Sequence, residues 1–186
     1  MLIQKYNPVW VRDFEAIKAV IQSALEGMNI KVEHVGSTSV PGLAAKPIID
    51  IDIVLYSKKE FNKINSRLSE IGYYHNGDQG IPTREAFKRK EPSINHAVLD
   101  KILHHLYVCP IDSPELDRHL VFRDYLSANE SARQAYEKIK RQIAAESNHD
   151  YKTYAQLKET RAKGFILSMI ELAKKELLSG RMTKFN

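Results

Sequence analysis

The fold is decided by one stretch of the chain, Glu33-His34-Val35-Gly36-Ser37-Thr38-Ser39-Val40-Pro41-Gly42-Leu43-Ala44-Ala45-Lys46-Pro47-Ile48-Ile49-Asp50-Ile51-Asp52-Ile53. An apolar segment ends at Gly36-Ser37, a loop of small residues follows, and the next apolar segment carries Asp50 and Asp52. Because side chains alternate between the faces of a strand, the two aspartates share one face and the isoleucines share the other. The stretch therefore predicts two strands, a connecting loop and a pair of carboxylates beside that loop.

This arrangement predicts a site for a metal ion and phosphate. Paired carboxylates are oxygen ligands of the kind that Mg²⁺ takes, and a glycine lets a phosphate approach the backbone closely. We expect Asp50 and Asp52 to hold Mg²⁺, and we expect phosphate contacts from Gly36, Ser37, Thr38, Ser39 and Lys46. The alternatives are polar positions on an open strand face for the aspartates, hydrogen bonds to turn amides for the three hydroxyls, and a surface position for the lysine.

Length and composition indicate an ordinary globular domain. The chain has 186 residues, of which 43% are hydrophobic and 27% charged. There is no run of about 18 apolar residues, the first residues do not resemble a secretory signal, and the lone Cys109 excludes an internal disulfide. We therefore expect a cytoplasmic protein without a membrane segment. The net charge of +5 and the pI near 9.2 permit a nucleotide or RNA partner, but solvated helix faces would give the same values.

The apolar pattern predicts a mixed α/β (α+β) part over residues 1–112 and a helical segment over 113–186 packed on it as one domain. Strands are expected over 31–35, 48–55, 73–75 and 102–109, and residues 84–90 form either a strand or a loop. Helices are expected over 13–26, 61–71, 114–128, 131–146 and 151–178. Ser57 and Glu60 have the spacing of a capping box.

Two motifs carry a resemblance to known proteins. Val35-Gly36-Ser37, followed after twelve residues by Asp50-Ile51-Asp52, is similar to the pattern of the nucleotidyltransferase superfamily. Residues 33–51 as a whole resemble the hallmark of the bacterial GrpB family, and Val121-Phe122-Arg123-Asp124-Tyr125-Leu126 resembles a second motif of that family. The likeness covers nearly the whole chain. It implies a nucleotidyltransferase-like mixed sheet flanked by helices, and a Mg-dependent site for a nucleoside triphosphate or another phosphorylated small molecule.

The chain departs from this resemblance on a later strand. Active nucleotidyltransferases usually carry a third carboxylate there, but residues 104–108 read His-His-Leu-Tyr-Val. We expect His105 and Tyr107 to share one face and line the cleft, with His105 taking the place of the acid as a metal ligand or proton acceptor. Alternatively, the site holds one metal ion or none and is catalytically idle. An acid reaching the cleft from elsewhere, such as Glu85, Glu91 or Asp100, would favour an enzyme.

Two further candidates stay open. Arg84 lies among basic residues that form either an anion-binding patch or a solvated loop, and His34 faces the cleft or makes a structural hydrogen bond. Three functions follow from the sequence: nucleotidyl transfer from a nucleoside triphosphate to a hydroxyl acceptor, nucleotide binding without turnover, and RNA binding as an accessory protein. The sequence leaves the oligomeric state undetermined.

Overall fold

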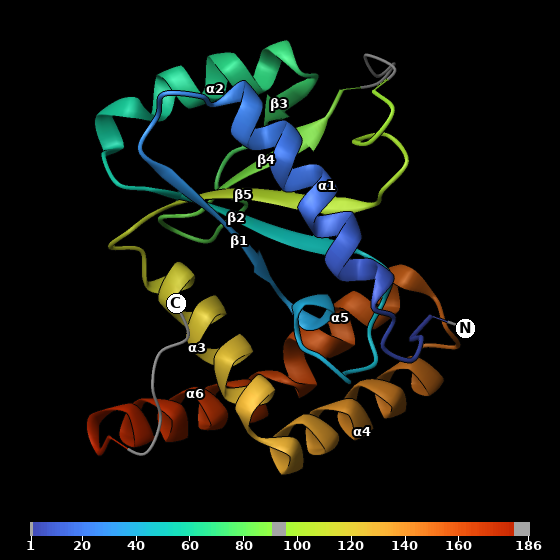
Figure 1. The fold of residues 1–186 in the computed structure, drawn as a ribbon. Helices are drawn as coiled ribbons and strands as arrows, with labels where there is room; N and C mark the ends of the chain where they lie inside the picture. Colours follow the sequence, from blue (N-terminus) through green and yellow to red (C-terminus); the bar gives the residue numbers. More distant parts are fainter. Residues whose placement is uncertain (1, 91–95, 181–186) are drawn as a thin grey trace.

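A five-stranded mixed sheet forms the centre of the molecule (Figure 1). The computed structural model describes residues 2–90 and 96–180, so Glu91, one of the acids considered above, lies outside the described residues. The strands follow the spatial order β1-β2-β5-β4-β3, and only β2 and β5 run parallel. Their bounds are Ile30–Val35 (β1), Ile49–Leu55 (β2), Tyr73–His75 (β3), Glu85–Arg89 (β4) and His104–Pro110 (β5).

Two helices, α1 (Val9–Ala24) and α2 (Phe61–Glu70), cover one face of this sheet (Figure 1). Ile51 and Ile53 of β2 point into that layer and are fully buried in one hydrophobic cluster with side chains of both helices. Since neighbouring strand residues face opposite sides, Asp50 and Asp52 point to the other face. The burial of the two isoleucines therefore fixes where the carboxylates point.

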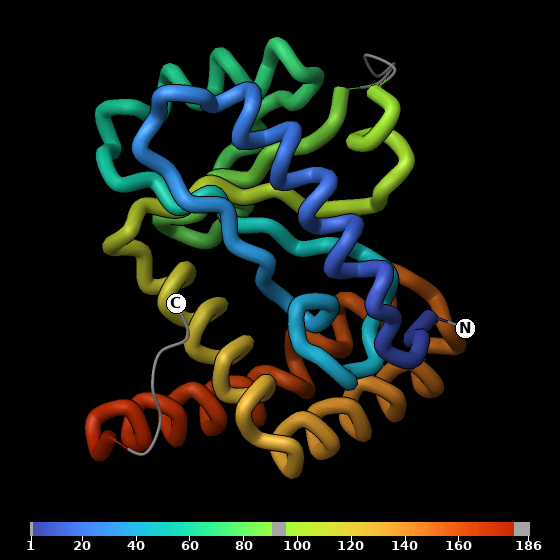
Figure 2. Tube along the Cα trace, viewed as in Figure 1, coloured from blue at the N-terminus to red at the C-terminus, as the bar shows by residue number. Residues whose placement is uncertain are grey.

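Four helices form the second half of the chain: α3 (Pro114–Ala128), α4 (Glu130–Glu146), α5 (Tyr151–Arg161) and α6 (Lys163–Leu178). They lie together on the far side of the sheet from α2 (Figure 1). Their cluster of buried residues includes Leu43 and Ala44 from the loop before β2 and Ile3 from the N-terminal segment. That segment runs beside the same loop (Figure 2), where Gln4 bridges Ala45. In residues 2–90 and 96–180, no helix is long and apolar enough to cross a membrane.

The expected elements form with three differences. The single helix expected over 151–178 is broken at the buried Ala162, so α5 packs on α4 and α6 packs on α3. The capping box at Ser57 is wrong, because the backbone carbonyl of Ser57, and not its hydroxyl, accepts the Glu60 amide at 3.0 Å in a 3₁₀ turn. Helix α1 begins before residue 13, because the Asn7 side chain accepts the Val9 amide at 3.0 Å.

The pairing of β2 with β5 sets the geometry of the candidate site. Asp50 is the register partner of His105, and Asp52 is the partner of Tyr107. Register partners on parallel strands project to the same face, so these four side chains share one surface. The expectation that His105 and Tyr107 share a face with the aspartates is met by this register.

Candidate functional site

A cleft of about 630 Å³ lies between this surface and the helical half. Its first wall is formed by Ser37, Asp50, His105 and Tyr107, from β2, β5 and the turn after β1. Its second wall is formed by side chains of α3, α4, α5 and α6, and the loop 80–82 closes one side. A volume of this size is typical of small-molecule sites.

Asp50 is the acidic group of the first wall. Its side chain is 31% exposed, and its Oδ1 lies 2.8 Å from Nδ1 of His105. Burial opposes ionisation, but the hydrogen bond and charge of His105, aided by the charge of Lys158, hold the pKa of Asp50 below its ordinary value. Asp50 is therefore an ionised carboxylate that a ligand in the cleft can reach.

Gly36 makes room for that carboxylate. Its φ of +72° lies in the left-handed region, and a Cβ built on it would stand 2.2 Å from Oδ2 of Asp50. Any side chain at position 36 would therefore displace Asp50 and strain the backbone. The Gly-Ser turn is needed for contact with the carboxylate as well as for a bend.

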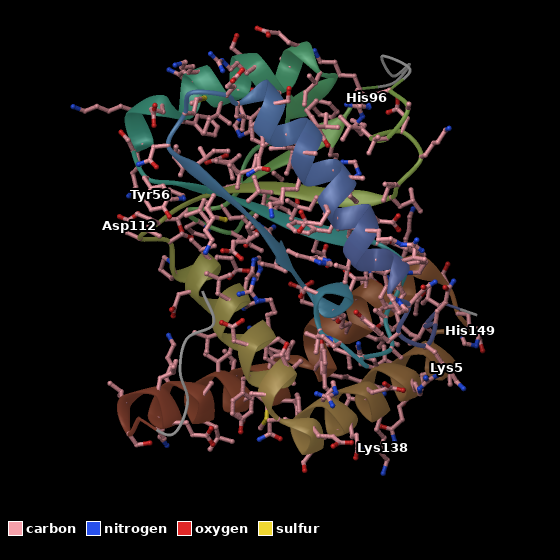
Figure 3. The ribbon with its side chains drawn as sticks, in the orientation of Figure 1. Lys5, Tyr56, His96, Asp112, Lys138 and His149 are labelled. Carbon is pink, nitrogen blue, oxygen red and sulfur yellow. The ribbon has the colours of Figure 1, made fainter. Side chains whose placement is uncertain are left out.

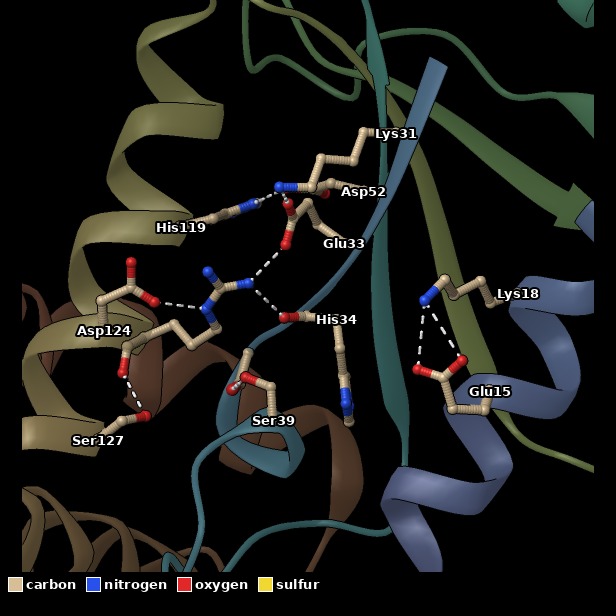
Figure 4. A network of polar contacts seen from close by, with 12 residues as sticks. Glu15, Lys18, Lys31, Glu33, His34, Ser39, Asp52, His119, Asp124 and Ser127 are labelled. Atoms are coloured by element: carbon tan, nitrogen blue, oxygen red, sulfur yellow. Dashed lines mark hydrogen bonds and ion pairs between the residues drawn. The ribbon is translucent and has the colours of Figure 1, made fainter. Parts of the chain in front are cut away.

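Asp52, two residues along β2, has a different environment. Its side chain is fully buried, and its Oδ2 lies 2.7 Å from Nδ1 of His119 on α3 (Figure 4). The other ring nitrogen, Nε2, lies 3.1 Å from Oε1 of Glu115. Burial disfavours the charged imidazole, yet the hydrogen bonds to the two carboxylates outweigh burial and raise the pKa of His119 to about 9. Burial in turn raises the pKa of Asp52.

Cations and aromatic rings surround the rest of the cleft. Lys46 from the loop before β2, Lys140 from α4 and Lys158 from α5 all line it. Nζ of Lys46 lies 3.8 Å from the ring centre of Tyr151 and 4.3 Å from that of Tyr154. Burial, and then the charge of Lys158, lower the pKa of Lys46 to about 8. The loop before β2 is thereby fastened to α5.

The other two lysines belong to the helical half alone. Lys140 is buried, its ammonium group donates to the carbonyl of Ala44, and burial lowers its pKa well below the ordinary value. Lys138, on the same helix, instead projects outward (Figure 3). The pKa of Lys158 is raised, chiefly by Tyr136, with Asp50 contributing. Both amines thus lie on the wall opposite the carboxylate.

A smaller cavity of about 170 Å³ adjoins the cleft and shares Ser37, Asp50 and Tyr107 with it. Arg84 lines this cavity with only 8% of its surface exposed, and its guanidinium carbon lies 4.3 Å from the ring centre of Tyr107. Burial raises the pKa of Tyr107 to about 12, so its hydroxyl stays protonated. The candidate Arg84 is therefore part of a built site and does not belong to a solvated loop.

Three of the expected phosphate and cleft residues make internal hydrogen bonds. Thr38 lines the cleft, but its hydroxyl donates to the Ile48 carbonyl at 3.2 Å and lies 3.0 Å from Nε2 of His34. His34 also stacks on Phe14, and burial lowers its pKa to about 4. Ser39 donates to the carbonyl of Gly36 at 2.6 Å. These contacts favour the structural alternative for all three side chains.

Sequence reasoning missed the groups that the helical half contributes. Glu115 and Glu159, and not Glu85 or Asp100, are the further acids that line the cleft. Glu85 is paired with His75 at 2.6 Å, and Asp100 with Arg89 at 2.7 Å. The i, i+4 spacing of Glu115 and His119 on the expected helix is the one sequence signal that could have marked this pair. Lys140 and Lys158 had no comparable signal, because helical lysines are usually solvated.

The carboxylates of the cleft suit Mg²⁺ only if the bound ligand supplies further oxygen atoms to the ion. Within the described ranges, no group of three or more His, Cys, Asp or Glu side chains is placed to hold a metal ion. Mg²⁺ commonly binds through one or two carboxylates together with the phosphates of its ligand. The oxygens on β2 suit that mode, in which a metal ion arrives with a phosphorylated molecule.

Comparisons with known proteins show the family and the fold of this chain. The sequence profile described as GrpB protein matches residues 1–167. UPF0157 protein YqkA of Bacillus subtilis is 32% identical over 154 residues, which are 83% of this chain and 43% of that protein. The chain thus spans less than half the length of that relative.

Two solved structures are similar to most of the fold. The crystal structure of the conserved protein GrpB from Enterococcus faecalis has a TM-score of 0.75 and 30% identity, covering 94% of this chain and 98% of that one. A structure of the Cid1 poly(U) polymerase with MgGTP has a TM-score of 0.53 at 14% identity, covering 78% of this chain and 45% of the polymerase. The fold is therefore nucleotidyltransferase-like. Within that class, the chain belongs to the GrpB family.

Proposed function

We propose that the cleft binds a nucleoside triphosphate together with Mg²⁺ and transfers its nucleotidyl group to the hydroxyl of a small acceptor. One observation carries this proposal: an ionised carboxylate, Asp50, shares a cleft of about 630 Å³ with Ser37 of the glycine turn and with three lysines. A triphosphate with its metal ion needs both kinds of wall. Its anionic oxygens pair with ammonium groups, and its cation pairs with a carboxylate.

Each wall has a part in this reaction. Ser37 and the backbone at Gly36 receive phosphate, Lys46 and Lys158 neutralise phosphate charge, and Asp50 of β2 holds the Mg²⁺. When bound, Mg²⁺ neutralises the charge that develops on the phosphates. The acceptor oxygen bonds to the α-phosphorus, the bond from that phosphorus to the bridging oxygen breaks, and pyrophosphate leaves. In this proposal a neutral His105, whose Nδ1 lies 2.8 Å from Oδ1 of Asp50, takes the hydroxyl proton on its other ring nitrogen.

Nucleotide binding without turnover is the second candidate, and one observation favours it. On β5, the register partner of Asp52 is Tyr107 and not a carboxylate. Glu115 lines the cleft and is the candidate for the third carboxylate, but it is already paired with His119. In this alternative the cleft keeps its ligand and the acceptor never reacts.

Titration calorimetry with ATP, GTP, CTP and UTP, each with Mg²⁺, tests the binding step. We expect at least one nucleotide to bind, and we expect Asp50→Asn and Lys158→Ala each to weaken binding about tenfold or more. Lys152→Ala is the matched control, because Lys152 is an exposed lysine of the same helix. Binding of none of the four nucleotides, or equal binding by all variants, would contradict the proposal.

Pyrophosphate release decides between the two candidates. Release that depends on Asp50 and on an added hydroxyl compound supports transfer. Binding without release, across a panel of sugars, alcohols and short RNAs, supports the non-catalytic alternative. Running the RNA arm at two salt concentrations also tests RNA binding, since affinity carried by phosphate contacts falls steeply with salt.

A further inference from the structure

The two carboxylates of β2 differ in how a ligand can reach them. Asp50 is 31% exposed and lines both the cleft and the adjoining cavity. Asp52 is fully buried and, among the described residues, is not part of the lining of either one. A cation that enters the cleft therefore meets Asp50 first, and meets Asp52 only if other groups move.

The group that covers Asp52 comes from the helical half. His119 on α3 bonds Oδ2 of Asp52 with one ring nitrogen and pairs with Glu115 through the other. Helix α3 starts at Pro114 after a capped turn, in which the Ser113 hydroxyl accepts the Leu116 amide at 3.3 Å. Asp52, His119 and Glu115 thus form a continuous chain of contacts from the sheet to the first turns of that helix.

One oxygen of Asp52 needs a separate account. Its Oδ1 is buried without a hydrogen-bond partner in the described part of the chain, and the same is true of Nε of Arg84. The charge of Arg84 acts on Asp52 and lowers its pKa against the larger effect of burial. The buried oxygen therefore lies in the field of a cation that the chain itself supplies.

We infer that the two aspartates have different roles: Asp50 holds the divalent cation at the cleft, whereas Asp52 fastens helix α3 to the sheet through His119. This inference rests on the proposed function for the cation, since it assigns that cation to one of the two carboxylates. Asp52 is then a positioning residue. It keeps α3 and its cleft-lining side chains, Glu115 and Arg118, at a fixed height above β2.

Mn²⁺ with inorganic tripolyphosphate is a suitable probe, because it carries the phosphates and the cation without a base. Electron paramagnetic resonance counts the free Mn²⁺. We expect wild-type protein to bind a single Mn²⁺ per chain, Asp50→Asn to weaken binding about tenfold or more, and Asp52→Asn to stay within about twofold of wild type. Asp112→Asn is the matched control, since Asp112 is an exposed aspartate paired with Lys58 at 2.8 Å.

Urea unfolding tests the other half of the inference. We expect Asp52→Asn and His119→Gln each to lower the urea midpoint, and the double variant to be no less stable than the worse of the two, because both remove one contact. Asp50→Asn should leave the midpoint closer to wild type. Additive losses for Asp52→Asn and His119→Gln would overturn the anchoring role.

The possible results distinguish a failure of this inference from a failure of the proposed function on which it rests. Equal loss of Mn²⁺ binding in Asp50→Asn and Asp52→Asn overturns the division of roles and leaves the proposed function standing. No binding of the probe by wild-type protein overturns both. Should Asp52→Asn not fold, a wild-type crystal soaked with Mn²⁺ and tripolyphosphate decides: an anomalous peak on Asp50 alone, with His119 still on Asp52, supports the inference, and a peak bridging both aspartates overturns it.

Discussion

The two walls of the cleft were assembled from the sequence in different ways. The sheet wall comes from neighbouring residues, with Gly36-Ser37 and Asp50 only a short loop apart. The helical wall gathers Lys140 and Lys158 from two helices far along the chain, and Nζ of Lys140 lies 4.8 Å from the ring centre of the buried Tyr136. A local motif is therefore paired with a surface that exists only in the folded protein.

The largest expected effect is at the joint between the two walls. Arg123 on α3 bonds Glu33 of β1 at 2.8 Å and Asp124 at 2.7 Å, with little exposure of any partner (Figure 4). Arg123→Ala removes this partner from Asp124 and leaves Glu33 with only its ion pair to Lys31, at 2.9 Å, so we expect a loss of about 3 kcal/mol in the free energy of unfolding. Urea denaturation measures this loss. Lys58→Ala, which breaks an exposed pair, should cost less than about 0.5 kcal/mol, and equal losses would mean that the two halves are not joined at Arg123.

A change confined to the sheet wall should be nearly as severe. Gly36→Ala places a methyl group against Asp50 at a positive φ, so we expect about 2–3 kcal/mol of destabilisation and loss of nucleotide binding. Thermal unfolding and calorimetry measure the two effects. Gly27 also has a positive φ, but nothing lies within 4 Å of its added Cβ. Gly27→Ala should therefore cost about 1 kcal/mol and keep binding intact.

The contribution of His119, on the helical side, to the stability of the protein should depend on pH. The pKa of His119 is raised from 6.5 to about 9 in the folded protein, so its contribution to stability is complete below pH 6.5 and is lost as the pH rises through 9. We expect His119→Gln to cost roughly 2–3 kcal/mol at pH 6 and little at pH 10. Urea titrations at both pH values measure the difference. His75→Gln, at a more exposed pair with Glu85, is the control, and a loss for His119→Gln that is independent of pH would contradict the prediction.

The smallest effect expected is on affinity at the contact that joins the two walls, Lys46 against Tyr151. The pKa of Lys46 is lowered to about 8, and only its charged form attracts phosphate. Nucleotide affinity should therefore fall, by about tenfold at most, as the pH rises from 7 to 9. Lys46→Arg stays charged throughout and should flatten this part of the profile. An identical slope in wild type and Lys46→Arg would assign the pH dependence to other groups, His119 among them.

Sequence patterns predicted the sheet wall well. Alternation alone placed Asp50 and Asp52 on one face, and the turn chemistry marked Gly36. Alternation could not distinguish the two aspartates, because their difference in burial depends on His119, which lies 67 residues away from Asp52. For the same reason the hydroxyls after Gly36 looked alike, although Ser37 lines both cavities while Ser39 donates to its own turn.

The sequence predicted the helices of the second half of the chain, but it did not predict which of their side chains line the cleft. Its periodicity gave α3 and α4 nearly to the residue, since Ser113-Pro114 marks a start that local chemistry dictates. The break at Ala162 left no comparable mark, because it follows from two helices packing on different neighbours. Lys140 is the clearest limit: a buried lysine is rare enough that any sequence argument places it in solvent.

Strand β2 contributes side chains to both faces of the sheet, and this restricts insertions and deletions within the strand. Every second side chain of the strand belongs to the hydrophobic layer under α1, and the others, Asp50, Asp52 and Val54, point to the opposite face. Deleting or inserting one residue between Ile49 and Asp52 would exchange the two sets, turning carboxylates toward the core and isoleucines toward the ligand. Related chains can therefore vary in loops and helix lengths, but the spacing within this strand tolerates no odd-numbered change.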